Sequence, residues 1–218
     1  LWAKFKAIYP LVGGTAGTHK YNLKDPRDLD AAFRLQFSGG FTHSATGVLG
    51  NGTTGYANTF ITPSIHLLQN NCGFSYYNRT DSSVAGHKCF GVIDFTSTYR
   101  FYHNLNEGGA VYFNISRPST GESTVAVGTG KGLNTIMRPD STHEKFALNA
   151  AVTTFSQTSA GQPTLPCYLF AFNSNGIASG YSIHECAFAA VHEAMTDVET
   201  GLYRTIVQTC QTSLTRNV

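Results

Sequence analysis

The sequence predicts an all-β protein: an antiparallel jelly-roll β-sandwich with a short N-terminal helix and a C-terminal amphipathic helix. Twenty-two glycines are spread through the 218 residues, and turn-forming residues separate short aromatic or β-branched runs. Aromatic residues make up 12% of the chain and charged residues 13%, against a usual charged share of about 25%. This balance favours a packed core over disorder.

The length suits one domain. We expect residues 1–20 to form a connector with the first strand, residues 21–195 the sandwich, and residues 196–218 a helix packed on it or on a subunit interface.

The first elements are predicted near the N-terminus. Asp25 followed by Pro26 predicts a helix of one or two turns, because aspartate is a preferred N-cap and proline suits the first helical position. Phe33, Leu35 and Phe37 then alternate with polar residues, which is the period of a strand with one buried face.

A hairpin is predicted in the middle of the chain. Residues 99–104 and 111–115 alternate in polarity around the turn Asn-Glu-Gly-Gly at 106–109. This alternation places Tyr102 and Tyr112 on the side of the hairpin opposite the core. Further strands are expected at residues 123–127, 145–155, 167–172 and 182–191, with turns at 117–121, 128–132, 159–163 and 173–176.

The C-terminal helix is predicted to begin after Thr196, because residues 196–199 form a capping box and apolar residues then recur with helical spacing. The apolar side is expected to pack on the sandwich or on a neighbouring subunit. The residues assigned to this packing are Val198, Leu202, Ile206 and Val207.

Charge and cysteine usage exclude several classes of site. The net charge of +2, without a block of lysine or arginine, argues against a nucleic-acid partner. Apolar stretches are far shorter than the ~20 residues of a membrane helix, so no membrane insertion is expected. None of the five cysteines forms a C-x-x-C pair, which disfavours a zinc site. Cys186 and Cys210 are expected to be buried thiols, and a Cys72–Cys89 bridge stays open.

No catalytic signature is present, so we expect no enzyme. His184-Glu185 and His192-Glu193 are separated by strand-like sequence instead of the His-Glu-x-x-His spacing of a metal site. The carboxylate run Glu-x-Asp-x-x-Glu of sandwich glycosidases and the Gly-x-Ser-x-Gly elbow are both missing. Asp25, Asp28 and Asp30 lack the glycine and glutamate of a calcium loop. No cofactor is therefore expected. Calcium elsewhere on the rim stays open but is not indicated.

Sugar sites combine aromatic faces with amide, hydroxyl and guanidinium groups, and such side chains gather near predicted strand ends. The residues predicted to contact a glycan are Tyr76, Tyr77, Asn78, Arg79, Tyr102, Tyr112, Asn173 and Asn175. The tyrosines among them are equally suited to a subunit interface, where aromatic residues are enriched.

The opening of the chain resembles a module of tailed-bacteriophage virion proteins, a concanavalin A-like or LamG-like jelly roll found in fibres and appendages. The residues that carry the resemblance are 8–16 (IYPLVGGTA) and 19–35 (HKYNLKDPRDLDAAFRL), with further segments at 39–44, 51–59, 75–80, 196–199, 202–203 and 211–216. Phe41 and Asn58 stand where the family has tryptophan and aspartate, and residues 191–194 replace a glycine-containing turn.

The resemblance implies a jelly roll on the virion, in a fibre, tail or capsid appendage. It also implies a homotrimer in contact with other virion proteins, with a host-surface glycan as candidate ligand. Two alternatives stay open. One is a polysaccharide depolymerase, a glycoside hydrolase whose carboxylates the fold brings together. The other is a decoration or assembly protein without a ligand.

Overall fold

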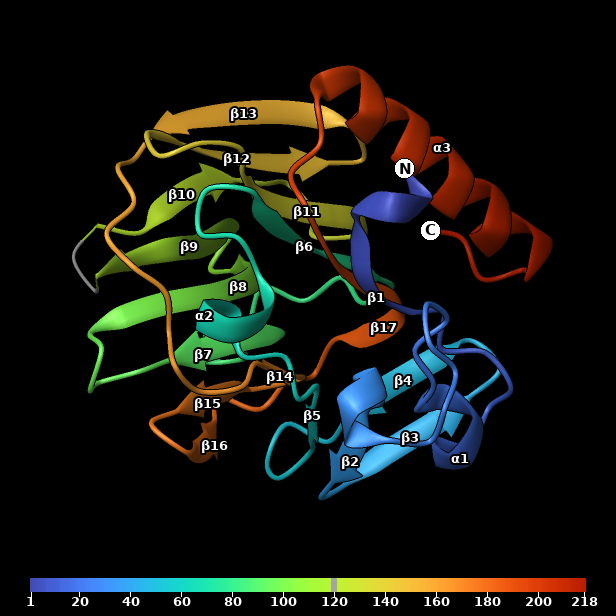
Figure 1. Ribbon diagram of the computed structural model, residues 1–218. Helices are drawn as coiled ribbons and strands as arrows, with labels where there is room; N and C mark the ends of the chain where they lie inside the picture. Colours follow the sequence, from blue (N-terminus) through green and yellow to red (C-terminus); the bar gives the residue numbers. More distant parts are fainter. Residues whose placement is uncertain (119–120) are drawn as a thin grey trace.

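Short alternating strands build two stacked antiparallel β-sheets, which confirms the predicted jelly-roll sandwich (Figure 1). The structure is a computed structural model that describes residues 1–118 and 121–218. The first sheet contains β1 (Phe5–Tyr9), β3 (Phe41–Ser44), β4 (Gly47–Gly50), β6 (Cys72–Asn78), β11 (Gly132–Arg138), β12 (His143–Leu148), β13 (Ala151–Ser156) and β17 (Glu185–His192). The second contains β2 (Gln36–Ser38), β5 (Tyr56–Asn58), β7 (Phe90–Ile93), β8 (Tyr99–Glu107), β9 (Ala110–Pro118), β10 (Ser123–Ala126), β14 (Tyr168–Leu169), β15 (Phe172–Ser174) and β16 (Ile177–Ser179).

The strand order places distant parts of the chain side by side. The first sheet runs β13-β12-β11-β6-β17-β4-β3, and β1 pairs with β17. The second runs β10-β9-β8-β7-β14-β5-β2, with β15 parallel to β7 and the β15–β16 hairpin beside it. The predicted central hairpin is confirmed as β8 and β9, which are joined at Gly108 and Gly109, both with positive φ.

The helices are α1 (Ala16–His19), α2 (Pro63–His66) and α3 (Asp197–Ser213), with 3-10 turns at Trp2–Lys4 and Asp30–Ala32. The helix predicted at Asp25 is wrong. The carboxylate of Asp25 binds the guanidinium of Arg27 at 2.5 and 2.7 Å instead of capping a helix, and its backbone forms a bridge with Asn22.

Four predicted strands have different limits, three of them because residues adopt left-handed backbone angles. Residues 145–155 form two strands, since Asn149 and Ala150 turn the chain with φ of 50° and 78°. Phe170 (φ 68°) interrupts the strand predicted at 167–172, and Phe33 (φ 58°) delays β2 to Gln36. The last strand of the sandwich begins at Glu185 instead of residue 182. The predicted turn at 117–121 includes residues 119–120, which lie outside the described residues.

The main core lies between the two sheets. Phe74 of β6 stacks on Phe90 of β7 with ring centroids 3.6 Å apart, so the two layers are in direct aromatic contact. Cys72 and Cys89 are both buried free thiols, so no bridge joins them. Cys186 is buried as predicted, whereas the prediction for Cys210 is wrong because α3 turns this thiol to the surface.

A second core lies between the first sheet and α3, which covers the outer face of that sheet. The capping box at Thr196 is confirmed, and Tyr203 and Val207 are buried against the sheet. Val198, Leu202 and Ile206 do not pack on the sandwich, since these residues are 84%, 54% and 53% exposed. Of the two predicted packings, only the subunit interface stays open for them. At 100° per residue, Val198 and Leu202 lie far from the side of α3 that carries Tyr203 and Val207. Ile206 lies nearer to that side and lines an apolar groove with both of these residues.

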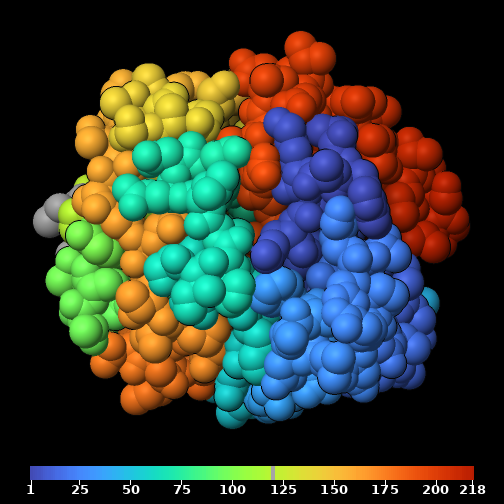
Figure 2. Space-filling model, in the orientation of Figure 1, coloured from blue at the N-terminus to red at the C-terminus, as the bar shows by residue number. Residues whose placement is uncertain are grey.

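The two ends of the chain lie against each other, as the blue and red surfaces of Figure 2 show. Lys4 Nζ lies 2.8 Å from Glu199 Oε2, and buried Arg216 donates to the carbonyl of Leu11 at 2.9 Å. No helix in the described ranges is both long and apolar enough to cross a lipid bilayer.

Candidate functional site

The side chains predicted to bind glycan at the end of β6 are part of the interior. Tyr76 faces the core and its hydroxyl donates to the carbonyl of His184 at 3.0 Å. Tyr77 faces α3 and donates to Gln208 Oε1 at 3.0 Å. Asn78 is fully buried and its amide donates to backbone carbonyls. The glycan prediction is therefore wrong for these three residues, because none of them reaches solvent.

Of the other residues predicted to contact a glycan, Arg79 and Asn173 have structural roles, and Asn175 lies in a turn. Arg79 lies 2.8 Å from Glu185 Oε2 and donates through Nε to the carbonyl of Arg216, which joins β6 to the C-terminal segment. Asn173 is buried, donates to the carbonyl of Pro166 and accepts from the backbone N–H of Gly176, so it is not a surface contact. Asn175 is exposed at the β15–β16 turn, where its φ is 51°.

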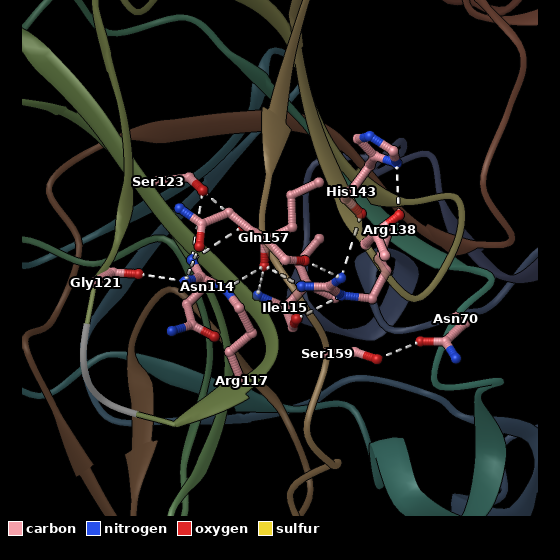
Figure 3. Close-up of polar contacts among 12 residues, drawn as sticks. Asn70, Asn114, Ile115, Arg117, Gly121, Ser123, Arg138, His143, Gln157 and Ser159 are labelled. Carbon is pink, nitrogen blue, oxygen red and sulfur yellow. Dashed lines mark hydrogen bonds and ion pairs between the residues drawn. The ribbon is translucent and has the colours of Figure 1, made fainter.

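A sealed ionic cluster joins the two sheets (Figure 3). Glu144 of β12 accepts from Arg117 of β9 at 3.0 and 3.1 Å and from Arg138 of β11 at 2.8 Å. Further donors are Ser123 Oγ at 2.7 Å and the backbone N–H of Ile115 at 2.8 Å. The side chains of Glu144 and Arg138 are 0% exposed and that of Arg117 is 5% exposed. The cluster fixes one sheet to the other and is closed to a substrate.

A buried serine and histidine also lie within hydrogen-bond distance. Ser75 Oγ is 2.7 Å from His192 Nε2, and His192 Nδ1 is 2.7 Å from the carbonyl of Glu193. Burial lowers the pKa of His192 to about 4, so the ring is a neutral acceptor. Phe5 and Tyr203 pack on the histidine, and Ser75 is 0% exposed. This pair belongs to the packing beneath α3.

The outward face of the second sheet carries an open depression of about 630 Å³. Alternation along β8 sends Phe101 and His103 inward and Arg100, Tyr102 and Asn104 outward. Loops and the β15–β16 hairpin form the other walls. The lining residues are Ala85, Lys88, Ile93, Arg100, Tyr102, Asn104, Glu107, Gly108, Tyr112, Glu122, Phe172, Ser179 and Gly180.

Aromatic rings form part of this surface. The rings of Tyr102 and Phe172 are 4.9 Å apart at an angle of 45°, and Lys88 Nζ lies 5.8 Å from the Phe172 centroid. Tyr112 is half-buried at the side. The predicted outward orientation of Tyr102 and Tyr112 is therefore confirmed, although neighbours cover Tyr102 to 1% exposure.

Charged groups in the depression form two different pairs. Lys88 Nζ lies 2.6 Å from Glu107 Oε2, which also accepts from the amide of Asn104 at 3.0 Å. Burial raises the pKa of Glu107, but the hydrogen bond from Lys88 and other donors outweigh burial, so the net pKa is lowered. The second pair is loose: Arg100 NH1 and Glu122 Oε1 are 3.9 Å apart.

Two buried polar atoms in the depression have no hydrogen-bond partner among the described residues: the hydroxyl of Tyr102 and Oδ1 of Asn104. Burial raises the pKa of Tyr102, and Glu122 raises it further, so the hydroxyl keeps its proton. Buried polar groups are normally paired, which makes this surface suited to a polar ligand.

Sequence reasoning found two tyrosines of this depression and missed its charged groups. Arg100 lies two residues from Tyr102 on the same strand, so the same alternation predicts its orientation. Lys88, Glu122 and Phe172 come from separate loops and strands that only the folded sheet brings together.

The structure places Asp25, Asp28 and Asp30 in ion pairs with arginine and lysine side chains. Within residues 1–118 and 121–218, no group of three or more His, Cys, Asp or Glu side chains is arranged to hold a metal ion.

Comparison with known proteins shows the fold alone. No protein-family model matches the chain, and no curated protein sequence matches it. Domain 4 of AbnA, a GH43 extracellular arabinanase from Geobacillus stearothermophilus in complex with arabinotriose, superposes with a TM-score of 0.60 at 12% identity, covering 91% of this chain and 97% of that domain.

Toxin domains share the same sandwich. The binding domain of botulinum neurotoxin DC in complex with rat synaptotagmin II has a TM-score of 0.61 at 7% identity and is matched by 95% of this chain. The serotype D binding domain has a TM-score of 0.58 at 6% identity and is matched by 94% of this chain. The chain spans 52% of the length of each of these toxin chains.

Proposed function

We propose that the chain is a non-catalytic, glycan-binding sandwich module of a tailed-bacteriophage appendage, and that the depression on the second sheet holds the glycan. The observation that carries the proposal is the combination of aromatic rings with unpaired polar groups in one open surface of about 630 Å³. Sugar sites need both kinds of group. The phage context and the place on the virion rest on the resemblance of residues 8–35.

The binding role is favoured over catalysis by the state of the carboxylates. A glycosidase needs a carboxylic acid whose pKa is raised, so that it protonates the leaving oxygen. Glu144 is sealed between the sheets, and the pKa of Glu107 is lowered in its pairing with Lys88. A toxin domain described as a binding domain shares the fold, and so does domain 4 of AbnA, which is in complex with arabinotriose.

A depolymerase is the second candidate, because Glu107 and Glu122 line the same depression. That activity would be established if the native protein shortened a host polysaccharide on incubation and the Glu122→Gln variant did not. The third candidate is a decoration or assembly protein without a ligand, and the experiment below also tests it.

The module is proposed to form a trimer that contacts other virion proteins, with the outer side of α3 as the seam between copies. Val198, Leu202 and Ile206 form an exposed apolar stripe along two helical turns. Such a stripe is suited to burial between subunits, where apolar area stabilises association.

The proposal is tested by exposing the purified protein to a panel of bacterial surface polysaccharides while retention and new reducing ends are measured together. We expect retention without cleavage, and loss of retention in Tyr112→Ala. Tyr21→Ala is the control, because Tyr21 is a tyrosine at the surface, 36% exposed, that is not part of the depression. Absence of retention across the panel would overturn the glycan role, and new reducing ends would overturn the non-catalytic role.

A further inference from the structure

We propose that the depression selects neutral sugars, by binding two adjacent hydroxyl groups between Arg100 and Glu122 while the Tyr102 hydroxyl makes a third hydrogen bond. This inference rests on the proposed glycan-binding function and names the class of sugar that the same site takes. Its argument comes from the hydrogen-bonding capacity that the lining residues leave unused.

Arg100 and Glu122 face each other without forming a hydrogen bond. Their closest atoms are 3.9 Å apart, and the side chains are 21% and 38% exposed. Arg100 makes no side-chain hydrogen bond to any other described residue, so its N–H groups stay available. A guanidinium only donates and a carboxylate only accepts, whereas a hydroxyl group does both. One sugar hydroxyl can therefore accept from Arg100 while its neighbour donates to Glu122.

Tyr102 supplies the second observation. Its hydroxyl is buried, lines the depression and has no hydrogen-bond partner in the described part of the chain. Its ring is held in place by Phe172, 4.9 Å away. A buried polar group without a partner destabilises the protein. A ligand oxygen that forms a hydrogen bond with this hydroxyl removes that penalty, which adds to the free energy of binding. Tyr102, Arg100 and Glu122 all line the depression, and Arg100 lies two residues from Tyr102 on the same face of β8.

The charges of the depression argue for a neutral ligand. Two cations and two carboxylates line it, and Lys88 and Glu107 are already joined at 2.6 Å. A sugar carboxylate bound to Arg100 would lie next to Glu122 and be repelled, and an amino sugar bound to Glu122 would lie next to Arg100. Two neutral hydroxyl groups are repelled by neither side chain, and the charges of Arg100 and Glu122 continue to compensate each other.

The test is a titration, by ligand-observed NMR, of the methyl glycosides of glucose, galactose, mannose and glucuronic acid. We expect one of the three neutral glycosides to bind and the glucuronide to bind less tightly. Glu122→Gln, Arg100→Gln and Tyr102→Phe should each weaken the neutral ligand about tenfold, the effect of one hydrogen bond to a charged or buried group. Affinity for the neutral ligand should not change between low and high salt, because no net charge is brought together.

Tyr76→Phe is the matched control for Tyr102→Phe. Both remove one buried hydroxyl, but that of Tyr76 binds the carbonyl of His184 and that of Tyr102 binds no described residue. We expect Tyr76→Phe to lower the thermal midpoint and keep the affinity for the sugar. We expect Tyr102→Phe to keep the thermal midpoint and lower the affinity for the sugar. This contrast separates lost binding from lost folding.

The outcomes separate this inference from the proposed function. Tighter binding of the glucuronide, strengthened in Glu122→Gln, would overturn the neutral-sugar inference and leave glycan binding standing. Retention of a polysaccharide with which no neutral glycoside competes would do the same. Failure of every glycoside and every polysaccharide to bind would overturn both.

Discussion

Glu144 accepts hydrogen bonds from two arginines in the interior, and this arrangement depends on all three charges. Its carboxylate compensates Arg117 and Arg138, whose remaining donors bind carbonyls such as that of Ile115 at 2.7 Å. Removing one partner of a buried ionic group leaves the other charges uncompensated, which costs far more than breaking an exposed pair.

We expect Glu144→Gln to lower the free energy of unfolding by about 3–5 kcal/mol, because two buried guanidinium groups then lack a counter-charge. Chemical denaturation measures the change. The control is Lys145→Gln, since Lys145 pairs with Asp197, which is 64% exposed. Equal effects of the two substitutions would contradict the role given to the sealed cluster.

At the scale of elements, α3 shows that helical periodicity does not determine which face is buried. The apolar residues of this helix occupy two sides: Tyr203 and Val207 pack on the first sheet, whereas Leu202 and Ile206 face outward. Sequence alone predicted the helix and its cap, but the register of the helix on the sheet depends on Phe5 and Phe188, which meet Tyr203.

Substitution on the two sides of α3 should therefore have different effects. Tyr203→Ala is expected to lower the free energy of unfolding by about 3 kcal/mol or more, because it opens a cavity against the sheet. The double variant Leu202→Ala and Ile206→Ala should leave the unfolding of the monomer nearly unchanged and shift sedimentation toward smaller species. A large loss of monomer stability in the double variant would contradict the subunit seam.

The turn between β12 and β13 yields a second prediction at this scale. Ala150 has φ of 78°, a left-handed conformation in which a Cβ is unfavourable. Ala150→Gly should raise the free energy of unfolding by about 1 kcal/mol, whereas Ala151→Gly, at the exposed first position of β13, should lower it by about 0.5–1 kcal/mol. Thermal denaturation of both variants measures the difference in sign.

At the scale of the whole molecule, four buried histidines make stability depend on pH. Burial is the main reason that the pKa of His103 is lowered to about 3 and those of His19, His184 and His192 to about 4. Neighbouring histidines contribute to the lowered pKa of His19, His103 and His184. The unfolded chain, in which histidine titrates near 6.5, therefore binds more protons than the folded chain below that pH.

Stability should be fully present above about pH 6.5 and fall as the pH decreases towards about 4 and 3, because unfolding takes up protons in that window. Denaturant midpoints measured across this range test the expectation. His103→Leu should flatten the profile, since His103 packs on Phe74 and Phe146 and its ring nitrogens have no partner among the described residues. A midpoint that rises on acidification would contradict the assignment.

The candidate site shows where sequence reasoning stops. Alternation along one hairpin was enough to turn Tyr102 and Tyr112 away from the core, because side chains of successive strand residues point to opposite faces. The same reasoning did not detect that Tyr76 and Tyr77 are both buried, since α3 covers the face that the isolated sheet would expose. Burial on both faces depends on a helix more than a hundred residues away.

The sequence by itself determined the sandwich class, the central hairpin and the capped C-terminal helix, because each follows from local periodicity and turn or cap residues. Only the tertiary structure decided where the open surface lies, which charges are sealed and which side of α3 stays exposed. Arg100 and Glu122 lie on opposite sides of residues 119–120, and Lys88 and Phe172 come from still more distant segments. These residues lie close together because of the strand order, which local sequence patterns do not predict.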